Sequence, residues 1–286
     1  MADIVEFWIR NKHVHLLPQP VEGRNNGSCT IIHIPKDDPK IDQLREIYHW
    51  LREEHDDYLF LNWNISRHYT KAEWANAQLY YWNCEKAFEP LGEQCGTIYD
   101  ETQACDICGV NAPMVGPLRL RTKTIPRKHD VSATYAKEYI FSARFKAACE
   151  AYQLQGIRFQ QVHNHQNQPI DWFQIQPIAQ PLTITGSTIT GGNPFDLSEK
   201  SENEVYKCPK GGNHTIGLNR ISELYVHKTS DIEQYDLFET EQKIGCRRGM
   251  LRPAPERLCS PAFRNMVLRE KLKGFFFEIA HVESSV

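Results

Sequence analysis

Hydrophobic and polar positions follow two different periods in the N-terminal part of the chain. The apolar, β-branched runs at 4–9 and 29–34 are typical of strands, and the Gly and Asn residues at 23–27 indicate a turn between them. Apolar residues then recur at helical spacing over 41–51, with charged residues between them. A further apolar run at 58–63 predicts another short strand.

A capping-box pattern marks the next predicted helix. In Thr70-Lys71-Ala72-Glu73, the Thr70 hydroxyl can accept the Glu73 N–H, and the Glu73 carboxylate can accept the Thr70 N–H. The apolar residues that follow predict a helix that continues to about Cys84. Pro90 and Gly92 end this part, so we place a soft boundary near residue 92 and expect a mixed α/β region at 1–92.

The rest of the chain repeats one pattern without gaps. The residues Ser142, Phe145, Leu154, Gly156, Phe159 and His163 match Ser260, Phe263, Leu272, Gly274, Phe277 and His281. In each copy a serine N-cap opens a helix, a glycine ends it in a left-handed conformation, and a short apolar strand follows. We therefore predict the α+β class, with a duplicated domain at 93–286 whose copies span about 93–165 and 205–286.

Two short stretches carry metal-ligand chemistry. Cys105-Asp106-Ile107-Cys108-Gly109 can offer two thiolates to one ion, and the stretch from Cys208 to His214 offers one thiolate and one imidazole. A tetrahedral zinc site needs four ligands. The sequence therefore predicts one structural zinc ion, held by Cys105, Cys108, Cys208 and His214, that joins the two copies.

Other interpretations of these residues stay open at this stage. The Cys-x-x-Cys pair fits two buried thiols or a redox pair as well as a metal site. Cys84, Cys95, His163 and His165 compete for the place of the fourth ligand. A set of four protein ligands favours a closed structural site over a catalytic one.

Four arginines lie close together in the sequence, namely Arg247, Arg248, Arg252 and Arg257. We regard Arg247, Arg248 and Arg252 as candidates for contact with an acidic partner. A solvated face with local salt bridges is the alternative.

Composition and motifs limit the function classes. The net charge of −3 and the pI of about 6.5 argue against nucleic acid as a partner. No apolar run reaches the ~20 residues of a membrane span, and the N-terminus lacks the pattern of a signal peptide. With nine cysteines, an odd number, we expect free or metal-bound thiols in the cytoplasm. The sequence contains no Gly-x-Ser-x-Gly, Walker or His-Glu-x-x-His motif, so we predict no enzymatic activity.

The order of the motifs resembles a known family. Gly92-Glu93 and Gly96-Thr97-x-Tyr99-Asp100 lead to Cys105-x-x-Cys108-Gly109, and Cys208-x-x-Gly211-Gly212 follows later. This order is similar to that of the bacterial double-CXXCG proteins, although Gly211 replaces the second cysteine of the second motif. The ending Leu272-Lys273-Gly274-Phe275-x-x-Glu278 also resembles the ends of immunity proteins from polymorphic toxin systems.

The resemblance implies an intracellular antidote. Such a protein binds its cognate toxin domain and blocks the active site or the target-binding surface of the toxin. A zinc-dependent hydrolase or modifying enzyme that reverses the toxin's damage is the alternative.

Overall fold

The computed structural model describes residues 2–20, 22–197 and 206–284. The chain divides into two compact units. The first contains the chain up to Asn76 and a segment that begins at Gly191, and the second contains residues 77–190 and the chain from residue 206 onward. The sequence pattern placed a boundary near residue 92. The division instead falls after Asn76 because strand β5 (Leu79–Cys84) pairs with strands near the C-terminus.

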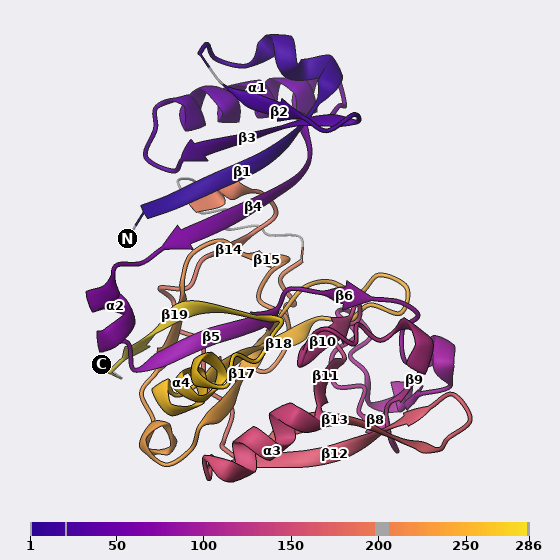
Figure 1. Ribbon diagram of the computed structural model, residues 1–286. Coiled ribbons are helices and arrows are strands. Elements are labelled where there is room, and N and C mark those ends of the chain that lie inside the picture. The colour runs from indigo at the N-terminus through magenta and orange to yellow at the C-terminus, as the bar shows by residue number, and fades with distance from the viewer. Residues whose placement is uncertain (1, 21, 198–205, 285–286) are drawn as a thin grey trace. The chain divides into compact units, whose positions relative to one another are not determined.

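An antiparallel sheet in the order β2-β3-β1-β4 forms the first unit (Figure 1). Its strands are β1 (Ala2–Arg10), β2 (Gly23–Asn25), β3 (Cys29–Pro35) and β4 (Phe60–His68). Side chains alternate along β1, so that Val5, Phe7 and Ile9 are buried on one face. Helix α1 (Lys40–Glu54) packs on this face, where the Tyr48 ring stacks on Phe60 at a centroid distance of 5.3 Å. The strands predicted at 4–9 and 29–34 and the helix predicted at 41–51 are confirmed.

Helix α2 (Lys71–Asn76) begins with the predicted capping box. The Thr70 N–H donates to Glu73 Oε2 at 2.7 Å, and the Glu73 N–H donates to Thr70 Oγ1 at 3.2 Å. The predicted continuation of this helix to Cys84 is wrong, because Leu79–Cys84 is strand β5. The run from Leu79 to Trp82 is buried throughout, and its neighbours in the sheet are β18 and β19.

Two sheets make up most of the second unit. One has the order β16-β19-β5-β18-β17, with β16 (Leu224–His227), β17 (Leu237–Ile244), β18 (Ala254–Cys259) and β19 (Phe275–Glu283). The other has the order β6-β10-β11-β13-β12-β9, with β6 (Ala87–Phe88), β9 (Arg119–Leu120), β10 (Val131–Thr134), β11 (Tyr139–Ser142), β12 (Ile157–Asn164) and β13 (Pro169–Pro177).

The remaining elements are short. The strands are β7 (Ile98–Tyr99), β8 (Met114–Val115), β14 (Thr190–Gly191) and β15 (Asn219–Arg220). The 3-10 helices are Asn11–Leu16, Glu93–Cys95, Glu101–Gln103, Thr122–Thr124, Pro194–Leu197 and Ser230–Glu233. No helix in the described ranges is long and apolar enough to cross a bilayer.

An aromatic core lies between the two helices of the second unit. These helices are α3 (Ala143–Ala151) and α4 (Pro261–Arg269), which contact β13 and β5 respectively (Figure 1). Phe145 of α3 and Phe263 of α4 are fully buried, with ring centroids 5.8 Å apart. Trp82 of β5 stacks on Phe263 at 6.2 Å. Burial of three such large rings stabilises the unit and fixes the two helices against each other.

Each helix belongs to a helix–glycine–strand segment, as the sequence pattern predicted. Ser142 and Ser260 cap the two helices, and each hydroxyl accepts the N–H three residues further on at 3.1 Å. Gly156 and Gly274 follow with φ of +79° and +94°, and strands β12 and β19 begin directly after them. The left-handed backbone favours glycine at both positions.

Two aspartates connect these segments reciprocally. Asp130 accepts hydrogen bonds from the Ser142 hydroxyl and from the backbone N–H of Lys273, both at 2.8 Å. Asp236 accepts in the same way from the N-cap serine of α4 and, at 2.7 Å, from the backbone N–H of Gln155. Each aspartate thus joins the start of one segment's helix to the end of the other segment's helix.

The fold is mixed α and β and consists mostly of strands, which is compatible with the predicted α+β class. The repeated pattern does not extend to the cysteine loops. One loop, with Cys105 and Cys108, lies between two paired strands, whereas the other, with Cys208 and His214, lies between residue 206 and β15.

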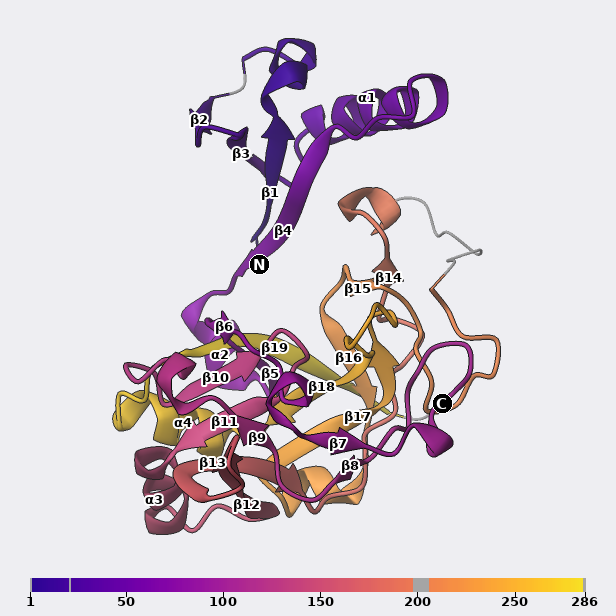
Figure 2. The same cartoon turned by 90° about the vertical axis from the view of Figure 1, so that its right-hand side faces the viewer.

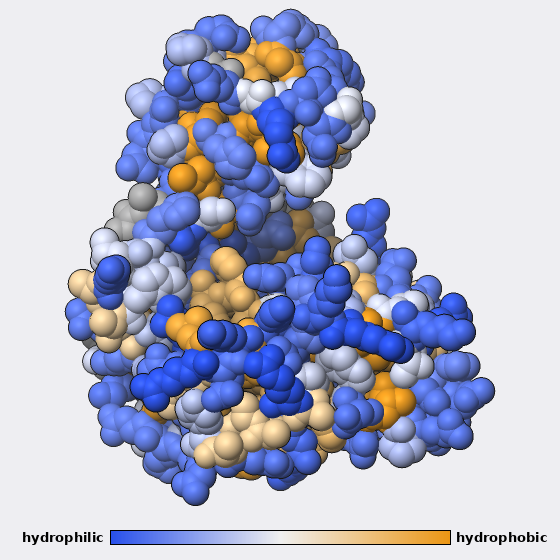
Figure 3. Space-filling view, viewed as in Figure 1, coloured by the Kyte–Doolittle hydropathy of each residue, from blue (hydrophilic) through white to orange (hydrophobic). Residues whose placement is uncertain are grey.

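On the face shown in Figure 3 the surface is mainly hydrophilic, and apolar side chains are exposed there in small groups.

Candidate metal centre

The first two cysteines lie at the end of a hairpin. Strands β7 and β8 pair antiparallel (Figure 2). The loop between them carries Cys105 and Cys108. The Cys105 N–H donates to the Val110 carbonyl at 2.8 Å, and the Gly109 N–H donates to the Cys105 carbonyl at 2.9 Å. Gly109 has φ +74°, a left-handed conformation that glycine adopts without strain. These bonds close the loop into a tight turn.

The second loop is held against β17. The Cys208 N–H donates to the Thr215 carbonyl at 2.9 Å, and Thr215 forms a parallel bridge with Lys243 of β17. Gly211 stands where a second cysteine of a Cys-x-x-Cys motif would stand, and its φ is +62°. The His214 N–H donates to the Gly211 carbonyl at 3.2 Å. The turn through Gly211 thus brings the His214 imidazole back toward Cys208.

The four predicted ligands lie together. One ligand atom from each of Cys105, Cys108, Cys208 and His214 lies within 4.8 Å of the other three. Nδ1 of His214 is 3.3 Å from Cys108 Sγ and 3.6 Å from Cys208 Sγ. In a tetrahedral zinc site, with Zn–S of about 2.3 Å and Zn–N of about 2.0 Å, the sulfur–nitrogen separation is about 3.5 Å. The arrangement can therefore hold one metal ion, with Nδ1 as the imidazole ligand.

The alternative ligands lie outside this group. Within the described ranges the group does not include Cys84, Cys95, His163 or His165. The Cys84 thiol donates instead to the Lys86 carbonyl at 3.4 Å, and His163 Nδ1 contacts the backbone of Asn167 at 3.1 Å. The cysteine ligands themselves are 3–6 % exposed, and Val110 packs against them.

The surroundings of the thiols favour deprotonation at one of them. Desolvation acts to raise the pKa of Cys105, but hydrogen bonds from the Cys108 and Ile107 N–H groups outweigh it and lower that pKa. Burial raises the pKa of Cys108. Lys210 Nζ lies 2.5 Å from Asp106 Oδ1, and this contact raises the pKa of Lys210 and links the two loops beside the thiols.

The three arginines predicted to contact a partner have different surroundings. Arg252 donates to Glu93 at 3.0 Å and also pairs with Glu101. Arg247 pairs with Glu101 at 3.4 Å, and its side chain covers Gly109, where an added Cβ would meet Arg247 Cδ at 2.7 Å. Arg248 is exposed, and its side chain has no ion pair or hydrogen bond with other described residues. Two of the three therefore make local salt bridges, and Arg248 is left for other contacts.

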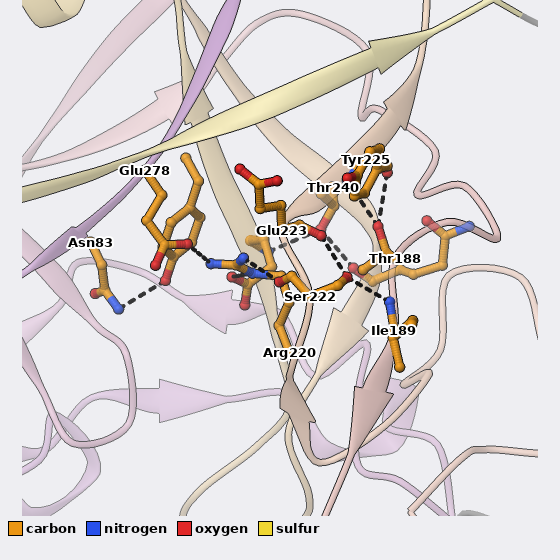
Figure 4. Close-up of polar contacts among 12 residues, drawn as sticks. Asn83, Thr188, Ile189, Arg220, Ser222, Glu223, Tyr225, Thr240 and Glu278 are labelled. Atoms are coloured by element: carbon orange, nitrogen blue, oxygen red, sulfur yellow. Dashed lines mark hydrogen bonds and ion pairs between the residues drawn. The ribbon is translucent and has the colours of Figure 1, made fainter. Parts of the chain in front are cut away.

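A second polar centre lies in the interior and carries no motif that would predict it. Arg220 Nη2 donates to Glu278 Oε2 at 2.6 Å, and Nη1 donates to the Ser222 carbonyl at 2.8 Å (Figure 4). Glu256 Oε2 lies 3.7 Å from Nε, and the guanidinium lies 4.3 Å from the centre of the Tyr81 ring. Burial acts to lower the pKa of Arg220, but the neighbouring carboxylates outweigh it and raise that pKa. This charged group joins four strands and is closed to solvent, which is typical of a structural ion network.

Comparison with known protein families found no family that matches this chain, and comparison with curated proteins found no similar sequence.

Proposed function

We propose that this chain is an immunity protein that binds a cognate toxin domain and blocks its active site or its target-binding surface. The resemblance of its motif order to double-CXXCG proteins and to the ends of immunity proteins motivates the proposal. The four-ligand cluster is the observation that carries it, because four protein ligands around one ion would join two loops and leave no coordination position for substrate. Such a centre suits a rigid binding scaffold.

The residues of the resemblance occupy framework positions, which supports this interpretation. The Gly92 N–H donates to Glu138 at 2.8 Å, and a Cβ on Gly92 would lie 2.3 Å from that carboxylate. A Cβ on Gly274 would lie 2.5 Å from the Val131 carbonyl oxygen. Glu278 belongs to the interior ion network. These motifs therefore maintain a scaffold, and a partner would bind at surfaces outside them.

We propose zinc as the metal of the centre. Three cysteine thiols and one imidazole within 4.8 Å of one another are a ligand set that zinc accepts in structural sites, and a reducing cytoplasm would keep the thiols available. Purified protein is expected to contain about one zinc per chain, and Cys208→Ala is expected to lose it. Cys246→Ala, at a half-buried cysteine outside the cluster, is the matched control. A folded wild-type protein that binds no metal would refute the proposal.

Co-expression tests the immunity function directly. The full chain is expressed with the toxin domain encoded next to it, and growth is measured together with size-exclusion chromatography of the tagged chain. We expect growth to be restored and the two proteins to elute as one stoichiometric complex. Failure of both would refute the proposed function.

Restored growth without a complex would favour the alternative function. In that case the chain would act on the toxin's product, as a zinc-dependent hydrolase or modifying enzyme. Such an enzyme needs a metal position open to water, so its activity would disappear with the zinc.

A further inference from the structure

Strand β12 leaves part of its outer edge without a partner strand. Figures 1 and 2 both show β12 at the margin of the second unit. Its inner edge pairs with β13, whereas β9 covers its outer edge only at His163 and Asn164. Among the described residues, no strand lies beside the outer edge of the stretch from Ile157 to Gln161. We call this stretch the β12 edge.

The backbone of the β12 edge points outward at every second residue. The Ile178 N–H donates to the Gly156 carbonyl at 2.9 Å, so these two residues form a hydrogen-bonded pair. Opposite residues of an antiparallel ladder alternate between bonded and non-bonded pairs. The N–H and C=O groups of Ile157, Phe159 and Gln161 therefore point away from β13. None of these groups bonds to the backbone of another described residue.

Other outer strands of the two sheets are covered by the chain itself. Residues 182–185 bond to the backbone of β16 and β17, and residues 214–216 bond to β17. The carbonyls of Lys86 and Lys273 accept hydrogen bonds from the backbone of β10. Covered edges cannot pair with another chain, so the β12 edge stands out among them.

The β12 edge is also accessible. Its Arg158 and Gln161 side chains are exposed, and its other residues are half-buried. Strand β19 has a comparable stretch before its pairing with β16, but Glu278 and Ile279 are buried there. Natural proteins often protect a free edge with lysine or proline, and residues 157–161 contain neither. The β12 edge is therefore open to pairing with a further strand.

A row of aromatic rings ends at the β12 edge and indicates which strand would fit. Phe141 of β11 lies opposite Phe173 of β13, and the Phe173 ring centroid is 6.2 Å from that of Phe159. A strand that places an aromatic side chain opposite Phe159 would continue this row, and aromatic cross-strand pairs stabilise sheets. A second copy of the β12 edge carries that side chain at its own centre.

The remaining positions of the β12 edge are self-complementary. When two copies pair antiparallel with Phe159 opposite Phe159, residue 157 of each copy lies opposite residue 161 of the other. Arg158 then lies opposite Gln160, whose side-chain oxygen can accept a hydrogen bond from the guanidinium. The only charged residue of the stretch thus faces an uncharged one. All three outward residues of each copy also meet outward residues, so every free N–H finds a free C=O.

We propose that two copies of this chain dimerise through the β12 edge, with a two-fold axis at Phe159. The backbone groups of Ile157, Phe159 and Gln161 bond to those of the second copy, and the two sheets that contain β12 become one continuous sheet. The Phe159 rings pack against each other across the axis. This inference goes beyond the proposed function and does not depend on it.

Charges introduced at the two ends of the β12 edge test this register. Gln161→Lys is combined with Ile157→Lys in one variant and with Ile157→Glu in the other. Because residue 157 lies opposite residue 161 of the second copy, the first variant places like charges across the interface and the second places opposite charges. We expect wild type to dimerise reversibly in sedimentation equilibrium. The dimer dissociation constant of the like-charge variant should be at least about tenfold higher than that of the opposite-charge variant.

Hydrogen exchange of the wild-type protein provides a check that needs no variant. The amides of Ile157, Phe159 and Gln161 should gain protection as the protein concentration rises, because they find acceptors only in the dimer. The amides of Arg158 and Gln160 point toward β13 and should be protected at every concentration.

Three results would overturn the inference. The first is a wild type that stays monomeric and leaves the outward amides of the β12 edge unprotected at high concentration. The second is equal dimerisation of the two charge variants, because the dimer would then use another surface. The third is protection of the outward amides only when the toxin domain is added, which would make a strand of the toxin the occupant of the edge.

Discussion

The second unit joins distant parts of its chain in two different ways. At the cysteine loops, four side-chain atoms converge on one point, and Val110 is the apolar residue that packs with the three cysteines. At the helix–glycine–strand segments, reciprocal aspartate bonds lie beside a core of buried aromatic rings. The first connection, if zinc binds there as we propose, depends on an ion that the solution supplies. The second depends on apolar burial and hydrogen bonds that the chain contains itself, so the two should respond differently to the same conditions.

Removal of the metal should have the largest effect, and it should weaken the cysteine loops more than the helix–glycine–strand segments. Excess EDTA, or Cys108→Ser, is expected to lower the free energy of unfolding by more than about 4 kcal/mol, because ligand binding to the folded state is lost. Hydrogen exchange should quicken at the Cys105 and Cys208 amides, while the strand amides of β12 and β19 keep more of their protection. Cys246→Ser is the control. Equal loss of protection in all four regions would mean that the connections are not independent.

Removal of one reciprocal aspartate should have a smaller effect and leave the metal bound. Asp236→Ala leaves the Gln155 N–H and the α4 cap without their acceptor, which should cost about 1–3 kcal/mol in urea denaturation. Asp130→Ala should cost a similar amount, because its contacts with Ser142 and Lys273 correspond to those of Asp236, and its further ion pair with the exposed Arg144 at 3.3 Å is screened by solvent. Asp171→Ala, at an exposed position of β13, is the control. Loss of zinc in either variant would contradict the view that the two connections are independent.

The ion pair between the two cysteine loops should matter least. Lys210→Ala removes the contact with Asp106. The side chain of Lys210 is 46 % exposed and that of Asp106 is 77 % exposed. Solvent screens such a pair, so we expect a change in stability below about 1 kcal/mol and little change in zinc affinity, measured by competition with a chelating dye. A loss of stability as large as that of Asp236→Ala would indicate that Lys210 directly stabilises the thiolates.

Local signals in the sequence predicted local structure well. Thr70, Ser142 and Ser260 cap the helices that they were expected to cap, because a capping hydroxyl bonds to an N–H only three residues away. The prediction failed where distant pairing decides the structure. The apolar run Leu79–Cys84 fits both a buried helix and a buried strand, and its contacts with β18 and β19 select the strand.

The candidate site could be predicted in part. A tetrahedral ion needs four ligands, and this requirement pointed to Cys105, Cys108, Cys208 and His214 although the loops are far apart in the sequence. No comparable requirement predicts the interior Arg220 network from the sequence, because the partners of a buried ion pair have no fixed spacing along a chain. Likewise, the three arginines within residues 247–252 look alike in the sequence, and only their neighbours in the structure distinguish Arg248 from the two that pair locally.

The position of β5 has a consequence for synthesis of the chain on the ribosome. Its neighbours on both sides are β18 and β19, which the ribosome makes long after β5 itself. Until those strands leave the exit tunnel, a buried apolar run that includes Trp82 has unpaired backbone on both edges. Late pairing of this kind exposes a nascent chain to aggregation, so we expect β5 to be a site where chaperones engage the chain during translation.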